Sequence, residues 1–456
     1  MNKKKINVDL VRLGLLLLVA LACMMAFVLV QPLGDGPDEI DRYKVVQYIY
    51  NHGTLPVGDD SEVLLEGYGG SYAFQPILTY IIQGYLLRAL RVFDLSELTM
   101  LVIARLVCVA TGLTAVVYTW LIGRQLFEDK RVAYLFTVAV TMLPQNLFVH
   151  TYVNTDSMGL LSVAIVIYAT IRGIKTMYDI PSVVNLILGI SICALSYYNC
   201  YGVVLAAAIT MIVYYCREGR RGIVELVSKA GIIIFGVMIL AGWWFIRNGI
   251  LYDGDILALK ARQLCAAETA LPEYNPLTRD TYYRLGIPLT TMIWGTDYYT
   301  LCWKSFIAMF GPMRIPTSHY IYMTYKYLCI VALAGLIIPR KKLEMPENRE
   351  ISQGDRSVIT IMMLVSGLIP VVLALYYSYT WEFQPQGRYY LPMVIPFMLL
   401  MTLGMRKVIA LISMPFRKLS RGKIFESLLY HGMYALIVLM TLYSVFFAML
   451  RYYGRV

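Results

Sequence analysis

Long apolar segments recur along the whole chain and constrain its fold more than any other feature. Eleven segments are long and apolar enough to cross a bilayer, which takes about 20 residues per helix. They lie near residues 10–31, 97–123, 131–149, 157–171, 181–198, 200–216, 228–249, 320–339, 357–377, 389–411 and 430–450. Soluble domains are about a quarter charged, whereas this chain is 15% charged and 59% hydrophobic. We therefore predict an all-α polytopic membrane protein with about eleven spans.

Basic residues between these segments predict how the chain is oriented. The net charge of +11 is spread over loops such as "RQLFEDKR" and "REGRR", a pattern typical of cytoplasmic loops and not of a nucleic-acid partner. Lys3–Lys5 are expected inside, followed by a first span that is retained, because no small-residue cleavage site follows it. If the amphipathic segment 73–93 also crossed, all later basic loops would lie outside. We therefore expect 73–93 to lie along the outer surface.

This orientation collects the unusual residues on the outer side of the membrane. The outward pieces are residues 32–96, 150–156, 250–318 and 379–390. The predicted organisation is a module of residues 1–249 that includes the first external loop 32–96, a long external loop of residues 250–319 with interfacial helices, and C-terminal membrane helices in residues 320–456. The eight cysteines and four histidines show no spacing typical of a metal site.

An acidic cluster directly follows the first apolar segment, with four acids between Asp35 and Asp41. Apolar residues recur with helical spacing over the stretch that follows. We predict a helix over residues 36–53, capped by Asp35 or Gly36 and ended by Gly53.

Asp38 and Glu39 fall in the first turn of that predicted helix, where the helix dipole keeps carboxylates ionised. Such a carboxylate can accept a proton from a hydroxyl or hold a divalent cation beside a phosphate. Asp156 begins another span on the same outer side, in "NTDSMGLL". Each acid alone could simply cap a helix, but two sites on one face favour catalysis, with Asp38 and Asp156 as candidate metal ligands. A minor role is open to the nearby His150.

Cationic and aromatic residues flank the same outer boundary. Arg247 and Arg388 stand at the outer ends of spans, and a guanidinium fork suits phosphate oxygens. The alternative for each is an arginine that snorkels to the interface. The long external loop adds Lys304 within an aromatic, amphipathic stretch. The candidates for substrate contact are Tyr72, Gln75, Asn154, Trp303 and Tyr389.

Six short motifs in order resemble landmarks of a known superfamily. They are "GPDEIDR", "FQPIL", "NTD", "RNGILYDGD", "SFIAMFG" and "QGRYYLP". Together they resemble the GT-C superfamily of integral-membrane glycosyltransferases, and within it a bacterial branch with a Pro-Asp-Glu motif. That branch is related to protein O-mannosyltransferases and aminoarabinose transferases. The chain departs from the pattern at Arg42, where the branch often has histidine, and at Gln75 and Ile77, which replace a cation and a proline.

The resemblance implies a polyprenyl-phosphate-linked sugar donor, a lipid, polysaccharide or protein acceptor, and transfer on the extracytoplasmic face of a cell membrane. It implies that an aspartate of the first external loop is the general base, usually with inversion. We assign that role to Asp38, with Glu39 or Asp156 orienting it or helping to bind a cation. Members differ in metal use, so Mg²⁺ or Mn²⁺ stays open. The donor-phosphate ligands are expected to be Arg247, Arg388 and Lys304.

Two other functions are compatible with a polytopic chain of this kind. One is a transporter or lipid flippase of envelope glycan precursors, although transporters usually place ionisable residues near the membrane centre. The other is a non-catalytic assembly or sensor subunit for envelope polysaccharide. The external position of the acids favours the glycosyltransferase.

Overall fold

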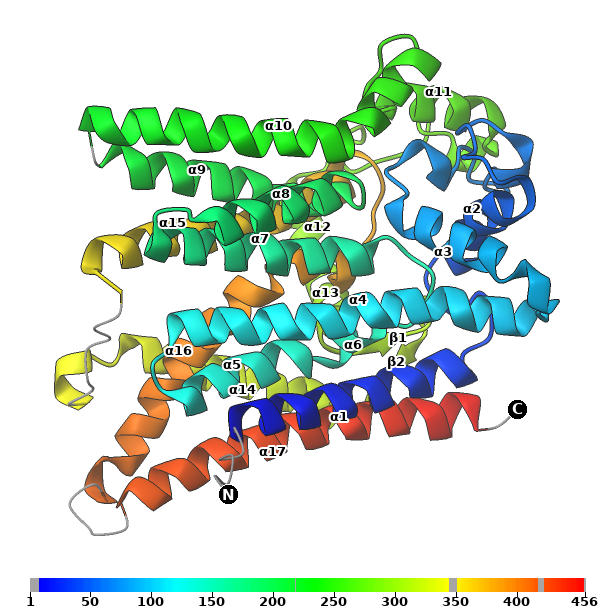
Figure 1. The fold of residues 1–456 in the computed structure, drawn as a ribbon. Helices are drawn as coiled ribbons and strands as arrows, with labels where there is room; N and C mark the ends of the chain where they lie inside the picture. The colour runs from blue at the N-terminus through cyan, green and yellow to red at the C-terminus, as the bar shows by residue number, and fades with distance from the viewer. Residues whose placement is uncertain (1–7, 218, 344–350, 417–421, 455–456) are drawn as a thin grey trace.

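The computed structural model describes residues 8–217, 219–343, 351–416 and 422–454, so Lys3–Lys5 lie outside the described residues. The described chain is a bundle of long helices that run side by side (Figure 1). Nine helical segments in these ranges are long and apolar enough to span a membrane. They are α1 (Val8–Val30), α4 (Glu97–Leu126), α7 (Asp156–Thr176), α9 with the turn before it (Tyr198–Cys216), α10 (Gly219–Leu251), α14 (His319–Ile337), α15 (Gln353–Thr380), α16 with its flanking turns (Gly387–Phe416) and α17 with its final π-helical turn (Gly422–Tyr453).

The predicted span over residues 131–149 is divided into two short helices. They are α5 (Lys130–Thr141) and α6 (Pro144–Phe148). Leu143, between them, has an extended backbone with φ −70° and ψ 118°. A residue before proline is biased away from the helical region, so Pro144 accounts for the break.

The predicted span over residues 181–198 is also shorter than expected. It is α8 (Ile180–Ala194), with 15 residues, whereas a span takes about 20. The predicted count of eleven full-length spans is therefore not confirmed, although the all-α membrane class is.

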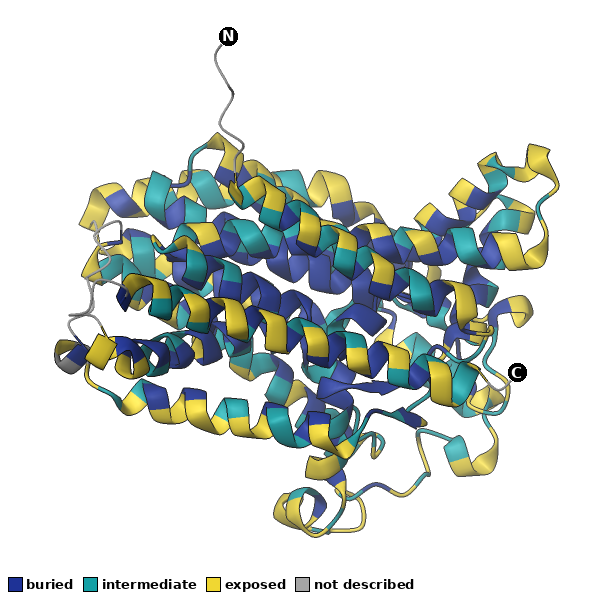
Figure 2. Ribbon diagram, turned by 90° about the horizontal axis from the view of Figure 1, so that it is seen from below, coloured by how far each residue is buried: buried dark blue, intermediate teal, exposed yellow. Residues whose placement is uncertain are grey.

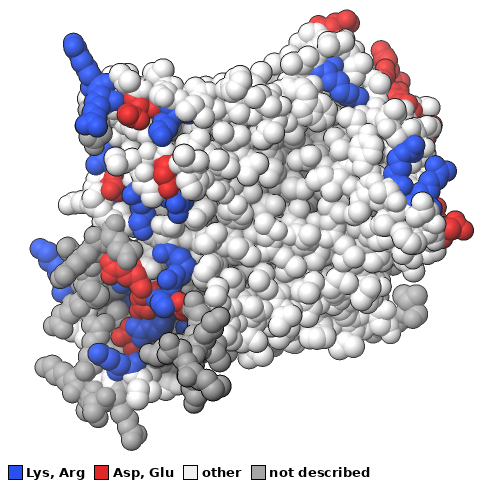
Figure 3. Space-filling view, viewed as in Figure 1, with Lys and Arg blue, Asp and Glu red and all other residues white. Residues whose placement is uncertain are grey.

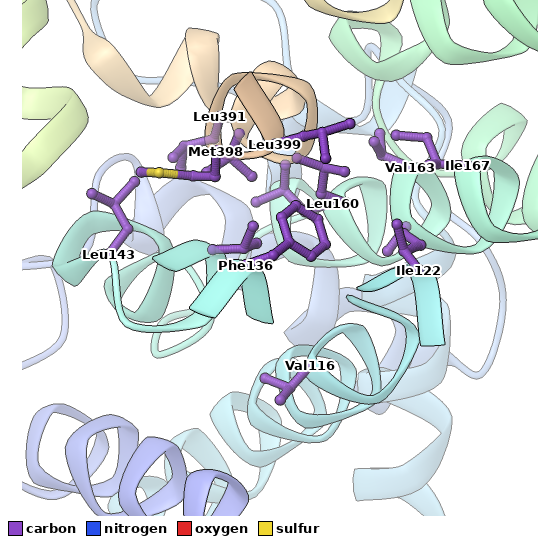
Figure 4. Close-up of a cluster of buried hydrophobic side chains, with 14 of the residues drawn as sticks. Val116, Ile122, Phe136, Leu143, Leu160, Val163, Ile167, Leu391, Met398 and Leu399 are labelled. Carbon is purple, nitrogen blue, oxygen red and sulfur yellow. The ribbon is translucent and has the colours of Figure 1, made fainter. Parts of the chain in front are cut away.

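The core of the bundle lies between α4, α5, α7 and α16, where apolar side chains from all four helices meet (Figure 4). In the most apolar stretch of α7, 89% of the residues are buried, whereas in that of α10 only 6% are. The outer helices turn exposed faces away from this interior (Figure 2). Helix association in lipid depends on close packing, because lipid is as apolar as the core. Gly335 of α14 and Gly404 of α16 provide such packing, since a Cβ on either would collide with the other helix's backbone.

Charged residues gather at the two ends of the bundle and leave a wide uncharged band between them (Figure 3). One end carries α2 (Glu39–His52), α3 (Leu78–Ala89) and α11 (Leu259–Thr269), and we call it the α2–α3 end (Figure 1). Helix α3 has 12 residues, too few to cross a bilayer, as predicted for residues 73–93. It packs tightly on α2, since a Cβ on Gly84 would collide with Ile49.

The long loop contains the short elements that fix the start of α16. They include α12 (Leu289–Trp294), α13 (Tyr298–Ile307) and a two-stranded antiparallel sheet of β1 (Met309–Phe310) and β2 (Ile315–Pro316). The 3₁₀ turn η7 (Gly387–Met393) leads into α16 (Val394–Ser413). The amide of Gly387 donates to Ser305 Oγ of α13 at 2.6 Å. This bond helps to place residue 388 beside the loop of residues 32–96.

The remaining helical turns are short 3₁₀ segments, except for the π-helical η9. They are η1 (Ser61–Val63), η2 (Tyr72–Phe74), η3 (Arg91–Phe93), η4 (Tyr198–Cys200, before α9 at Gly202–Cys216), η5 (Pro272–Tyr274), η6 (Arg340–Leu343), η8 (Met414–Phe416) and η9 (Met449–Tyr453, after α17 at Gly422–Ala448).

Candidate active site

Asp38 precedes α2 in an unusual backbone conformation. The helix begins at Glu39, so the predicted start at residue 36 with a cap at Asp35 or Gly36 was wrong. The amide of Glu39 instead closes a turn onto the carbonyl of Gly36 at 3.0 Å. Asp38 has φ 59° and makes no side-chain cap bond. Left-handed conformations outside glycine are uncommon and concentrate at functional sites. The Asp38 side chain therefore does not cap α2 and is free to make other contacts.

Four charged side chains meet at this point. Asp38 Oδ2 accepts a hydrogen bond from Arg388 Nη2 at 2.8 Å and lies 3.4 Å from Arg42 Nη2. Arg42 Nη1 donates to Asp156 Oδ2 at 2.9 Å. Arg42 therefore bridges the two aspartates, which the sequence predicted would meet at one site. We call Asp38, Arg42, Asp156 and Arg388 the charged cluster.

Asp38 is the accessible member of the charged cluster. Its side chain is 38% exposed, whereas those of Arg42, Arg388 and Asp156 are 5%, 7% and 7% exposed. A molecule that approaches the cluster from solvent therefore meets Asp38 first.

The two arginines also control the protonation of Asp38. Burial by itself would raise the pKa of this carboxyl, but the charges of Arg388 and Arg42 outweigh it. Hydrogen bonds from Arg388 and Tyr72 act in the same direction, and the pKa is held well below its usual range. Nearby positive charge stabilises the ionised form of an acid. Asp38 is thus a carboxylate throughout the neutral pH range.

Tyrosine rings hold the guanidinium groups in place. The Arg42 guanidinium lies 4.9 Å from the ring centre of Tyr72, and the Arg388 guanidinium lies 5.3 Å from that of Tyr389. A cation over an aromatic face is attracted by the ring quadrupole. Tyr72 and Tyr389 were predicted substrate contacts, and the structure places both directly beside the charged cluster.

Some arginine N–H groups of the cluster remain available for a ligand. Nε and Nη1 of Arg388 and Nε of Arg42 are buried and make no hydrogen bond to the described residues. Buried polar groups are nearly always hydrogen-bonded, and guanidinium donors pair well with phosphate oxygens. The cluster can therefore accept an anionic oxygen beside Asp38.

Glu39 lies next to Asp38 in sequence but points to a different partner. Its side chain is fully buried, with Oε1 2.8 Å from Arg105 Nε and Oε2 2.6 Å from Arg105 Nη2. The amide of Val153 also donates to Oε1 at 3.0 Å. Arg105 further donates to the carbonyls of Val28 and Gln31 at 3.2 and 2.7 Å. This pair ties α2 to α1, α4 and the turn before α7.

The other predicted phosphate ligands contact neighbouring segments. Arg247 Nη2 donates to the carbonyl of Pro56 at 2.7 Å, and its guanidinium lies 5.2 Å from the ring centre of Trp244. It therefore joins the end of α10 to the loop of residues 32–96. Lys304 stands in the last turn of α13, next to Ser305, which holds Gly387.

The remaining predicted contacts are divided between the cluster and the scaffold. Gln75 directly follows η2, the turn that carries Tyr72. Trp303 packs against the main apolar core. Asn154 is buried and donates to the carbonyls of Val149 and Tyr152, each at 2.8 Å, so its amide group shapes the turn before α7.

Two residues of the site were not assigned from the sequence. Arg42 was noted only as a departure from the family pattern, although it stands one helical turn after Asp38, the spacing at which side chains meet. Arg105 was missed entirely. A single arginine inside the otherwise apolar stretch of α4 was the available signal, because an ionisable residue within a span usually has a partner.

Comparison with known proteins gives matches among solved structures. No family model matches the chain, and no curated protein sequence matches it. The apo Archaeoglobus fulgidus oligosaccharyltransferase is similar with a TM-score of 0.58 and 13% identity, over 97% of this chain and 57% of that one. Its complex with an inhibitory peptide and a dolichol-phosphate gives a TM-score of 0.56 and 12% identity, over 95% and 56%.

The chain has the GT-C fold. Almost its whole length superposes on the oligosaccharyltransferase, but it spans little more than half of that protein, 57%. ArnT from Cupriavidus metallidurans bound to undecaprenyl phosphate also matches, with a TM-score of 0.48 and 12% identity over 96% of this chain and 75% of that one. At these identities the likeness to the oligosaccharyltransferase shows the GT-C fold and leaves the reaction to be inferred from the site.

Proposed function

We propose that this chain is a membrane glycosyltransferase that uses a polyprenyl-phosphate-linked sugar and works on the extracytoplasmic face. The observation that carries the proposal is the charged cluster, in which an accessible carboxylate stands beside buried arginines with unused N–H groups. The cluster lies at the α2–α3 end of the membrane bundle. The oligosaccharyltransferase of the same fold has been solved with a dolichol-phosphate and with a tethered acceptor peptide.

Arg388 is the proposed ligand of the donor phosphate. Its Nη2 pairs with Asp38, while Nε and Nη1 can receive phosphate oxygens. Buried cations stabilise charge that develops on a leaving phosphate. Lys304, in the last turn of α13, is the proposed second cation, whereas Arg247 holds the loop of residues 32–96 through the carbonyl of Pro56.

Asp38 is the proposed general base. A carboxylate with a depressed pKa is a weak base, since catalysis is best when the pKa lies near the working pH. A bound phosphate would bring negative charge beside Arg388 and so raise the pKa of Asp38. The base then strengthens only when the donor is in place.

The proposed reaction is a single displacement at the anomeric carbon. The acceptor hydroxyl gives its proton to the Asp38 carboxylate, and its oxygen forms the new glycosidic bond. The bond between the anomeric carbon and the phosphate oxygen breaks, and the electron pair leaves with the phosphate. Such a displacement inverts the configuration at that carbon.

We propose that helix α11 limits the access of water to this site by packing on the loop that carries Gly67 and Gly70. The amide of Gly70 donates to Thr269 Oγ1 at 3.0 Å, and that of Leu271 donates to the carbonyl of Gly67 at 2.8 Å. Tyr68 and Tyr274 stack with ring centres 4.2 Å apart. These contacts hold α11 over the first external loop. Water exclusion protects a reactive sugar phosphate from hydrolysis.

Replacement of Asp38 by asparagine tests the proposed function. Transfer from a polyprenyl-phosphate sugar should fall by about 10²–10⁴-fold, the usual contribution of a general base. The control is Asp41→Asn, because Asp41 is on the same helix but pairs with Lys44 at 3.1 Å. D41N should keep the wild-type unfolding temperature to within a few degrees, whereas D38N leaves Arg388 less compensated and should unfold at a lower temperature. Transfer by D38N is therefore measured well below its own unfolding temperature. Full transfer by D38N, or sugar-lipid translocation without transfer in proteoliposomes, would contradict the proposal.

A further inference from the structure

We infer that the Arg42 guanidinium is a built-in cation of this site and takes the position that a divalent metal would need between Asp38 and Asp156. Arg42 is then a positioning residue, and the site works without a metal ion. The activity arm of this inference rests on the proposed function, whereas the metal-binding arm does not.

The first support is the geometry of the bridge. One guanidinium lies 2.9 Å from Asp156 Oδ2 and 3.4 Å from Asp38 Oδ2. A Mg²⁺ or Ca²⁺ ion needs carboxylate oxygens at about 2.0–2.6 Å. The facing oxygen of each aspartate already contacts Arg42, whose side chain is 5% exposed. The ring of Tyr72, 4.9 Å from the guanidinium, confines it to this position.

The second support is the charge of the cluster. Two aspartates face two arginines, so the four side chains are neutral together. A divalent ion placed between the aspartates would meet two fixed positive charges at close range. Like charges repel strongly where the surroundings exclude water. The Arg42 side chain would have to move away from the two aspartates before such an ion could bind.

The third support is the lack of further metal ligands. Among the described residues, no three histidine, cysteine or acidic side chains are arranged to hold a metal ion. Glu39 is the nearest acid along the chain, but Arg105 and the amide of Val153 use its carboxylate. The donors near Asp38 and Asp156 therefore do not fit the Mg²⁺ or Mn²⁺ that the resemblance left open.

The chemical role of Arg42 follows from these contacts. It neutralises Asp156 and helps to orient the Asp38 carboxylate. The guanidinium is a covalent part of the chain and cannot be removed by a chelator. We therefore expect chelators to leave the activity of the site unchanged.

A metal-binding measurement without any substrate gives the first test. Mn²⁺ is titrated into the purified wild-type protein and into Asp156→Asn, and free Mn²⁺ is followed by electron paramagnetic resonance. We expect the two proteins to bind equally little. One Mn²⁺ bound by the wild type and lost in D156N would overturn the inference. This result does not depend on whether the protein transfers sugar.

A rescue experiment gives the second test. Wild-type transfer should be unchanged by EDTA and not stimulated by Mn²⁺. Arg42→Ala should lose at least tenfold in rate and recover part of it with Mn²⁺ or guanidinium ion, which a purely structural residue would not do. Arg42→Lys keeps the charge and should retain more activity than R42A, and it serves if R42A does not fold. Loss of wild-type transfer in EDTA, or equal rates for R42A and wild type, would overturn the inference.

Discussion

At the residue scale, Asp38 shows how backbone and charge act together. Its φ of 59° removes the carboxylate from the helix end, so that it does not cap α2. The released side chain pairs with Arg388, which comes from a segment 350 positions away. A local conformation of higher energy is thus compensated by a long-range ion pair.

The pKa of Asp38 predicts the pH dependence of transfer. The folded-state pKa is lowered, so the carboxylate is ionised above the unfolded value of about 3.9. Its contribution to stability is present above that pH and is lost only as the pH falls through the lower folded value. We expect kcat/KM, which reports on the free enzyme, to show no acid limb between about pH 5 and 7. An acid limb in that range that D38E shifts would contradict the assignment.

Glu39 and Arg105 predict a stability effect of another kind. Removal of one partner from a buried ion pair costs about 3–5 kcal/mol, because the other charge is left uncompensated. Glu39→Ala should therefore lower the unfolding temperature of the purified protein markedly. The matched control is Glu62→Ala, since Glu62 is 55% exposed and pairs with His52 at 3.0 Å. Its replacement should change stability by less than about 1 kcal/mol. Equal effects of the two variants would show that the Glu39 pair is not structural.

At the element scale, η7 is the segment that brings Arg388 to Asp38 in the loop of residues 32–96. Gly387 lies so close to α13 that a Cβ there would collide with the backbone of Phe306. The bond from its amide to Ser305 fixes the same contact. Only glycine allows such a close backbone approach.

Gly387→Ala tests whether this contact positions the cluster. The added Cβ must push η7 away from α13, so both the unfolding temperature and sugar transfer should fall. Gly432→Ala on α17 is the control, because no atom lies within 4 Å of the place that its new methyl group would take. Alanine favours a helix over glycine, and G432A should be as stable as the wild type or more so. Wild-type transfer by G387A would show that the close contact is not required.

At the scale of the whole molecule, the bundle has charged residues at its two ends and a wide uncharged band between them (Figure 3). The site lies at the α2–α3 end, where α11 also lies, and α9 ends at the opposite end (Figure 1). The basic loops that follow the positive-inside rule predict that the α2–α3 end is extracytoplasmic.

Two native cysteines report on this orientation. Cys265 is in α11, whereas the exposed Cys216 ends α9. In intact cells, a membrane-impermeant maleimide should label a variant that keeps only Cys265, and a variant that keeps only Cys216 should react after permeabilisation. Labelling of Cys265 should be slow, because burial raises the pKa of its thiol and the thiolate is the nucleophile. The reverse pattern would place the site on the cytoplasmic side.

Sequence alone determined the membrane class, the grouping of Asp38 with Asp156, and that residues 73–93 form no helix long enough to span. These properties follow from segment length, apolar content and loop charge, which are local and can be summed along the chain. The sequence analysis did not predict that residues 131–149 and 181–198 form shorter helices. Pro144 divides the first segment, and α8 ends at Ala194 in the second.

Only the tertiary structure decided which arginine serves which acid. Arg42 and Asp156 are 114 positions apart, and Arg105 and Glu39 are 66 apart. Ion pairing depends on distances of a few ångströms and on burial, and helix packing sets both. Arg388 and Arg247 both stand at the ends of predicted spans, and the sequence did not distinguish them. In the structure Arg388 pairs with Asp38, whereas Arg247 donates to the carbonyl of Pro56.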